Sequence, residues 1–304
     1  MTCPSRRGTH GARVARALHA ALTVGAVAIG VALPHAAAHA AETPEADRGF
    51  SYFMGVARQQ VRYTETGSFL PFRSEARGAS PMLVSGALYA LNDRLLMSLD
   101  NETTFYPDRS SEVWNATAAS FNGTVLTSPV LQRNGFSLQQ SKTQVLGLYR
   151  LRGPWFGVGG AALRTQSFKR FAFTPGPDNA VATPGDTTVE ESVAELVLNV
   201  GVGLESEQVR GQANHYSLRA LVGVPVWRRL TNTTAPLSTF DAKRGVDFGV
   251  EGRYSWALSD KIHAGGWASW SQVRRSAQTL GSNLEMPRSR LSGLGYGVEL
   301  LWKL

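Results

Sequence analysis

The segment Tyr296-Gly-Val-Glu-Leu-Leu-Trp-Lys-Leu304 ends the chain and decides its fold. Large apolar side chains share one face of this extended stretch: Tyr296, Val298, Leu300, Trp302 and Leu304. The opposite face carries Gly295, Gly297, Glu299, Leu301 and Lys303. A period of two with these residue types predicts a β-strand that has hydrocarbon on one side and a polar interior on the other.

The same segment resembles the C-terminal signal of Gram-negative outer-membrane β-barrel proteins, because Gly297, Leu300 and Trp302 precede an apolar last residue. The resemblance covers the final strand only and indicates no more specific family. It implies that the insertion signal consists of Tyr296, Gly297, Leu300, Trp302 and Leu304. It also implies that the periplasmic chaperones and the barrel-assembly machinery mature and insert the protein.

The beginning of the chain predicts export. Residues 1–40 have the form of a secretory signal peptide: a positive n-region, the uncharged apolar stretch 17–33, and Ala38-His39-Ala40 as the cleavage site. A transmembrane anchor is the alternative, but the stretch is rich in Ala rather than Leu. After residue 40 no run of about 18 apolar residues follows, so the mature chain lacks a hydrophobic helix of membrane-spanning length.

Charge and cysteine content narrow the function classes. The formal net charge is +8, and residues 1–40 contain four arginines and no other charged residue, so the mature chain carries +4. This balance gives little support to nucleic-acid binding and suits a surface that faces anionic lipopolysaccharide. The single cysteine, Cys3, leaves with the signal peptide, which excludes disulfides and thiol chemistry from the mature protein.

The rest of the chain reads as ten β-segments with connections that alternate between short and long. The predicted strands are 49–64, 79–91, 94–106, 137–152, 154–170, 189–206, 212–229, 244–258, 261–276 and 290–304. The long connections are 65–78, 107–136, 171–188, 230–243 and 277–289. Short turns at one end and long loops at the other predict a transmembrane antiparallel up-and-down barrel with both termini periplasmic.

We therefore expect three parts: signal peptide 1–40, a short periplasmic segment 41–48, and an outer-membrane barrel 49–304. Two alternatives remain at this stage. A soluble β-sandwich would not need alternating loop lengths over ten strands. A twelve-stranded barrel would result if 107–136 contained a hairpin around Asn122-Gly123.

Several strands leave their orientation open. In segment 137–152, Leu146 and Leu148 compete with Val145 and Tyr149 for the lipid side. In segment 49–64, Arg58 and the polar residues after it continue the parity of Tyr52, so this half lies above the membrane or a bulge switches the faces. Segment 212–229 puts Arg219, Gly223 and Arg229 on the lumen side. It also contains Pro225, which predicts a distorted ladder.

Aromatic residues near strand ends predict the two interfacial girdles of a membrane barrel. One girdle consists of Tyr52, Tyr89, Tyr149, Trp155, Tyr216, Trp256 and Trp302, and the outer one of Phe105, Phe168 and Trp270. Inward-facing charges predict a salt-bridged network that fills a narrow lumen: Glu195, Arg219, Asp247, Glu251, Arg253, Glu299 and Lys303. Buried charges persist only when they are paired. A narrow selective pore lined by the same residues is the alternative.

The sequence gives little support to an enzymatic function. The pair His215 and Ser217 resembles the His-x-Ser pair of outer-membrane phospholipases, without the surrounding residues of that family. Omptin surface proteases are also ten-stranded, but their Asp–His chemistry lies at the extracellular rim. Here the two histidines after residue 40, His215 and His263, follow predicted periplasmic turns.

The sequence thus predicts a non-catalytic barrel without metal or other cofactor. Its histidines are too few for a transition-metal site, and its acidic loop at Asp178 to Glu191 fits no calcium-loop template. The longest loop contains Trp114 and Phe121, which are candidates for surface recognition. We expect a charge-paired lumen, with surface interaction or envelope structure as the role. A narrow solute pore is the main alternative, and an omptin-like or lipid-modifying surface enzyme is a lesser one.

Overall fold

The computed structural model describes residues 49–304, apart from 68–69, 182–186, 207–212, 236–237 and 281–283. The predicted signal peptide and the segment 41–48 lie outside these residues. No helix in the described ranges is long and apolar enough to cross a membrane. The regular elements there are all strands: β1 (Phe50–Thr66), β2 (Phe72–Asn92), β3 (Leu95–Thr104), β4 (Ser110–Ala116), β5 (Ser120–Phe121), β6 (Thr124–Val125), β7 (Val130–Arg152), β8 (Trp155–Pro175), β9 (Val189–Glu205), β10 (Asn214–Asn232), β11 (Thr239–Phe240), β12 (Gly245–Ala257), β13 (Ile262–Arg275), β14 (Gln278–Leu280), β15 (Leu284–Met286) and β16 (Arg288–Lys303).

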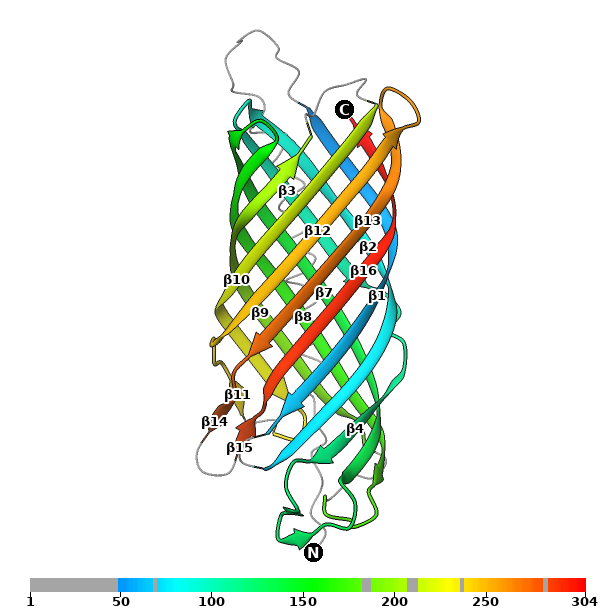
Figure 1. Ribbon diagram of the computed structural model, residues 1–304, viewed down its shortest axis with the longest axis vertical. Helices are drawn as coiled ribbons and strands as arrows, with labels where there is room; N and C mark the ends of the chain where they lie inside the picture. The colour runs from blue at the N-terminus through cyan, green and yellow to red at the C-terminus, as the bar shows by residue number, and fades with distance from the viewer. Residues whose placement is uncertain (1–48, 68–69, 182–186, 207–212, 236–237, 281–283) are drawn as a thin grey trace, which may run out of the picture. The chain divides into compact units, whose positions relative to one another are not determined.

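The main sheet is antiparallel and closes on itself, because β1 pairs with β2 on one side and with β16 on the other (Figure 1). Twelve segments belong to this sheet. Two of them add no position to the ring: β4 follows β3 between the same neighbours, β2 and β7, and β11 only extends the edge of β10. The predicted up-and-down barrel is therefore confirmed, with ten positions around the ring.

The two ends of the barrel differ. The terminal rim, which carries Phe50 and Leu304, has tight turns between β2 and β3, between β7 and β8, and between β12 and β13. The far rim carries the longer connections and the small strands β4, β11, β14 and β15 (Figure 1). This arrangement agrees with the predicted alternation of short and long connections.

Two of the predicted long connections are wrong in extent. β2 begins at Phe72 rather than near residue 79, so the first connection is short. Charged outward residues such as Arg73 and Arg77 concealed this strand, although its inward residues Phe72 and Ala76 are buried. The region 107–136 contains β4 and the first part of β7, because the third position of the ring is interrupted at 105–109 and then resumes.

The hairpin considered at Asn122-Gly123 exists. It joins β5 to β6 through a two-residue turn in which Asn122 and Gly123 both have positive φ, 48° and 81°, as a type I′ turn requires. The hairpin forms a separate two-stranded sheet and is not part of the barrel wall. The twelve-stranded alternative is therefore not realised.

β16 has the alternation that the sequence predicts. Tyr296, Val298 and Leu300 are 45, 64 and 42% exposed on the outer surface, whereas Glu299 and Leu301 face the lumen and are 4 and 2% exposed. The backbone N–H of Leu304 donates to the carbonyl of Phe50 at 2.8 Å and completes the closure. The last strand of the chain is thus the one that seals the ring.

The structure decides two orientations that the sequence left open. Leu146 and Leu148 of β7 are fully buried in the lumen, and Val145 and Tyr149 face outward. β1 keeps an uninterrupted register with both neighbours, so its outward Arg58 and Arg62 do not arise from a bulge.

The distortion predicted at Pro225 is confirmed. The register between β10 and β9 shifts between Pro225 and Trp227, and the ladder between β10 and β12 ends at Gly223. The bulge reverses the alternation beyond it. As a result Arg228 faces the lumen and is 4% exposed, and the predicted lumen position of Arg229 is wrong.

An apolar belt covers the outer surface on the side of the terminal rim. Its members are exposed, outward-facing side chains: Met54, Val56, Leu83, Met97, Val145, Leu163, Leu196, Leu198, Val200, Val202, Leu218, Val222, Val224, Phe248, Val250, Trp270, Leu294, Val298 and Leu300. Tyr149, Trp155, Tyr216 and Trp256 lie outward at the terminal-rim edge of the belt, where the sequence predicts a girdle. A soluble β-sandwich would not expose an apolar surface of this extent, so the belt argues against that alternative.

The barrel is taller than this belt. β7 has 23 residues, which at about 3.3 Å per residue and about 40° of tilt correspond to roughly 58 Å. A lipid-facing band is only about 25 Å tall. Beyond the belt, towards the far rim, outward positions carry charged residues such as Arg62, Arg77, Lys169 and Glu190. About half of the barrel therefore extends past the hydrocarbon.

Candidate functional site

The lumen is the first candidate site, and all seven charged residues predicted for it face inward. Glu251 is partly buried, and the other six are buried: Glu195, Arg219, Asp247, Arg253, Glu299 and Lys303. Rather than one network, six of them, all but Lys303, belong to two groups at different levels. Each group contains partners that the sequence analysis did not name.

The first group lies nearer to the terminal rim. Arg253 donates from Nε to Glu251 at 2.9 Å and from Nη1 to Glu299 at 2.5 Å. Arg219 donates from Nη1 to Asp100 at 3.0 Å and from Nη2 to Glu205 at 3.3 Å. Since both arginines approach Asp100, acids and bases from five different strands are neutralised together.

The second group is centred on Glu195 of β9. Arg275 binds this carboxylate through two nitrogens, at 2.8 and 2.6 Å, in the planar fork geometry that favours strong pairs. Arg228 lies 3.0 Å from the same carboxylate, and Arg164 bridges it at 3.5 Å to Asp247 at 2.8 Å. Three arginines and two acids thus cross-link five strands of the wall.

A third group, unrecognised in the sequence, lies towards the far rim. Arg170 is buried among Glu112, at 2.7 Å, Glu65, at 3.1 Å, and Glu191, at 3.9 Å. Its guanidinium also lies over the rings of Tyr63 and Trp114, at 6.0 and 5.7 Å from their centroids. Four charged groups are therefore held in a closed environment above the belt.

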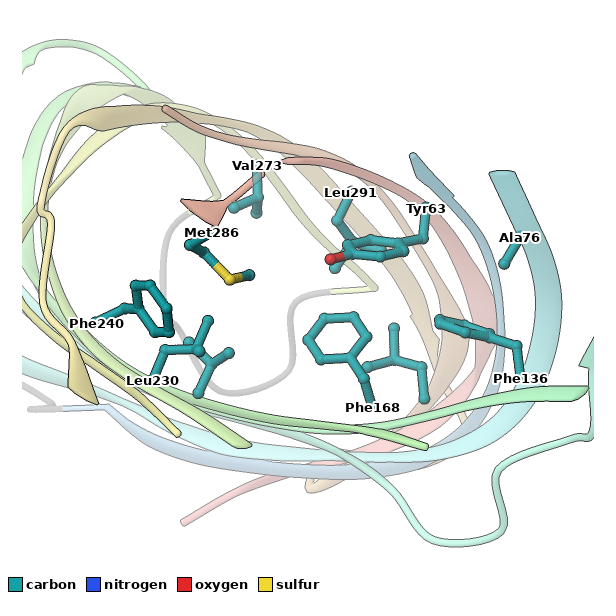
Figure 2. Packing of buried hydrophobic residues seen from close by; sticks show 11 residues of the cluster. Tyr63, Ala76, Phe136, Phe168, Leu230, Phe240, Val273, Met286 and Leu291 are labelled. Carbon is teal, nitrogen blue, oxygen red and sulfur yellow. The ribbon is translucent and has the colours of Figure 1, made fainter. Parts of the chain in front are cut away.

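An apolar cluster occupies part of the barrel interior (Figure 2). It contains Tyr63, Ala76, Phe136, Leu138, Phe168, Val193, Leu230, Phe240, Val273, Met286 and Leu291. We call it the lumen plug. Phe168 is 3% exposed and 4.7 Å from the ring of Tyr63, so its predicted place in the outer girdle is wrong, whereas Phe105 and Trp270 do face outward. The prediction failed because even-numbered residues of β8, which include Phe168, face the lumen.

Little free volume remains. A cavity of about 90 Å³ lies between the first two charge groups, with Gln140, Lys142, Gln144, Arg164 and Glu251 in its lining. A drug-sized ligand needs roughly 300 Å³ or more. The cavity can hold several waters, since one water needs about 10–15 Å³ of such volume.

The histidines lie on the terminal-rim side. His215 Nδ1 is 2.9 Å from Ser206 Oγ, and its Nε2 is 3.4 Å from Glu205. Ser206 also accepts a hydrogen bond from the backbone N–H of Tyr216, so its hydroxyl serves the β9–β10 connection. Ser217, the second residue of the His-x-Ser pair, faces the lumen, as the strand parity predicts, and is 6% exposed. The part of the chain that is described contains no group of three or more potential metal ligands.

The two aromatic residues predicted for loop recognition belong to a small cluster at the far rim. Phe121, from the β5–β6 hairpin, is 5% exposed and packs with Phe72 and Leu131. Trp114, from β4, stacks on Phe72 at 4.6 Å. They therefore hold the hairpin against the barrel, and recognition of an external ligand by them stays a prediction.

Asp100, Arg170 and Arg275 are among the lumen residues that sequence reasoning missed. A signal for two of them is present, because Asp100 shares the inward parity of Leu96 and Arg275 that of His263. Arg170 lies where the sequence predicts the end of a strand. Its inward direction follows only from the longer strand of the structure.

Comparisons with known proteins agree with the architecture. No protein-family model matches the sequence, and no curated protein does either. Among solved structures, the outer membrane protease OmpT from Escherichia coli matches with a TM-score of 0.57 at 9% identity, covering 86% of this chain and 98% of that one. The translocator domain of the autotransporter NalP from Neisseria meningitidis gives 0.35 at 10% identity, covering 95% and 96%. Neisserial surface protein A gives 0.31 at 12% identity, covering 82% and 95%. The chain has the fold of Gram-negative outer-membrane β-barrel proteins.

Proposed function

We propose that this protein is a non-catalytic integral barrel of the Gram-negative outer membrane, with an occluded lumen and a far end that serves surface interaction or envelope structure. The observation that carries the proposal is the filling of the lumen by three charge groups and the lumen plug. A path along the axis would have to break buried ion pairs of Arg170, Arg275 and Arg253. Separating buried pairs is costly, since each leaves an uncompensated charge.

In this proposal the termini are periplasmic and the far rim is extracellular. The long connections at the far rim and the charged outward residues beyond the belt support this orientation. The terminal strand would be read by the barrel-assembly machinery through Tyr296, Gly297, Leu300, Trp302 and Leu304. Of these, Tyr296, Leu300 and Leu304 are exposed on the outer surface, where such a reader could bind them.

Planar-bilayer recording on the refolded mature barrel tests the occlusion. We expect no discrete current steps from the wild type, with a general porin reconstituted in parallel to show that insertion succeeded. Stepwise conductance that changes when Glu251 is replaced by glutamine would support the competing proposal, a narrow pore through the central cavity. That outcome would overturn the occluded lumen.

The buried carboxyl group of Glu191 is expected to make the stability of the barrel depend on pH. It lies beyond the belt, between Glu190, whose side chain is 42% exposed, and the exposed Ser192. Burial, together with the negative charge of Glu65, raises the pKa of Glu191 from 4.5 to about 7, against the opposing effect of Arg170 and Arg228. The stabilising contribution of its protonation is thus fully present below pH 4.5 and is lost as the pH rises through 7.

Glu191→Gln should therefore flatten the pH dependence of unfolding and stabilise the barrel at pH 8, by up to roughly 3 kcal/mol. Urea unfolding in detergent at pH 4.5 and pH 8 measures the effect. Glu190→Gln, at the neighbouring exposed position, is the control and should leave the difference between the two pH values unchanged. Identical pH profiles for Glu191→Gln and the wild type would contradict the expectation.

A further inference from the structure

One side of the outer surface carries a concentration of arginines just beyond the apolar belt. They lie on four neighbouring strands, β13, β16, β1 and β2, which run side by side in Figure 1. All are exposed and outward-facing: Arg58, Arg62, Arg73, Arg77, Arg274, Arg288 and Arg290. We call this surface the basic face.

The strand register brings these arginines together. Arg62 is the direct neighbour of Arg77 across β1 and β2, and Arg274 is the direct neighbour of Arg290 across β13 and β16. Like charges on directly opposed residues destabilise a sheet. Such pairs persist where opposite charges nearby compensate the repulsion.

Two carboxylates form the ion pairs of the basic face within the described residues. Glu75 is shared by Arg62, Arg73 and Arg77, at 2.8, 3.8 and 2.9 Å, and Asp108 lies 3.5 Å from Arg58. The arginines of the basic face outnumber the carboxylates that pair with them among the described residues, so this surface is positively charged. The side chains of Arg73 and Arg77 remain 55 and 70% exposed, so they are open to a ligand.

The position of the basic face is as informative as its charge. Along the same four strands the apolar belt ends at Val56, Leu83, Trp270 and Leu294, all outward and more than 40% exposed. The other side of the barrel differs, because Lys169 and Glu190 pair with each other at 2.7 Å. The basic face thus places seven arginines beside the apolar belt on one side of the barrel.

We infer that the basic face binds the phosphate groups of a phosphorylated glycolipid of the outer leaflet, lipopolysaccharide, while the acyl chains of the same molecule lie on the adjacent belt. The inference rests on the orientation proposed above. Arginine suits this role because its planar guanidinium forms two parallel hydrogen bonds with a phosphate. A ligand that is anionic above and apolar below matches both surfaces at once.

The test is binding of purified lipopolysaccharide to the refolded, detergent-solubilised barrel, measured as lipid retained after size-exclusion chromatography. The triple variant Arg73→Gln/Arg77→Gln/Arg290→Gln should bind roughly a hundredfold more weakly. Arg94→Gln/Arg152→Gln, which removes exposed arginines at the terminal rim, is the matched control and should bind like the wild type. Glu75→Gln should bind more tightly, because it frees three arginines from their shared carboxylate.

Three results would overturn the inference: equal binding by the triple variant and the wild type, equal binding of dephosphorylated lipopolysaccharide, or equal binding of phosphatidylglycerol. The last would indicate a general anionic-lipid surface. These results are independent of the bilayer recording, because the substitutions lie outside the lumen. A conducting barrel that still binds the glycolipid would refute the occluded lumen and leave the basic face intact.

Discussion

Replacing Glu195 by alanine is expected to destabilise the folded barrel by about 3–5 kcal/mol, the usual cost of removing one partner from a buried ion pair. Glu195 is 1% exposed and is the shared acceptor of Arg275, Arg228 and Arg164. Asp247 alone would then have to neutralise the group. Arg228, whose Nε lies 3.0 Å from Glu195, would lose its closest carboxylate among the described residues.

The measurement is the urea dependence of unfolding of the refolded protein in detergent, followed by tryptophan fluorescence. The same strand supplies the control. Glu190→Ala removes an ion pair of similar length, 2.7 Å to Lys169, but both side chains of this pair are more than 40% exposed. Exposed pairs contribute about 0–1 kcal/mol, so the control should remain close to the wild type. Equal losses in the two variants would show that the lumen charges are solvated.

The sequence was informative where lipid imposes alternation. β16 and β12 meet hydrocarbon on one face, and their outward residues, such as Val298 and Val250, were identified correctly. Pro225 was a reliable marker of irregularity because its missing N–H cannot join a ladder. The ring of ten positions followed from these strands together with the turns.

Prediction failed where the wall leaves the hydrocarbon. In that part of β2 both faces tolerate polar residues, so Arg73 and Glu75 resembled a loop. The bulge after Pro225 exchanged the faces of Arg228 and Arg229, and a shift of one residue reverses every later side chain. The sequence therefore predicts which face of a strand each side chain occupies only as far as the next bulge.

The pairing of the lumen charges could not be predicted either. Arg275 meets Glu195, which is 80 residues away along the chain, across the barrel interior. Which arginine meets which carboxylate depends on the stagger between strands and on side-chain length. Neither quantity is visible in the alternation that revealed the inward faces.

Phe168→Ala is expected to cost about 3–5 kcal/mol, as large aromatic truncations in a packed core do. Phe168 is 3% exposed and contacts Tyr63 and Phe136 at ring-centroid distances of 4.7 and 6.1 Å in the lumen plug (Figure 2). The plug consists of side chains from strands on different sides of the barrel. A cavity there therefore removes contacts that connect opposite parts of the wall.

Phe105→Ala is the matched control, since Phe105 faces outward and is 53% exposed, and it should change the free energy of unfolding by less than about 0.5 kcal/mol. Both variants can be compared by urea unfolding and by planar-bilayer recording. The plug variant should stay electrically silent, because the buried ion pairs of Arg170 and Arg275 still fill the lumen. A Phe168→Ala barrel with wild-type stability would mean that the aromatic rings only occupy space. One that conducted would mean that the plug, rather than the ion pairs, seals the lumen.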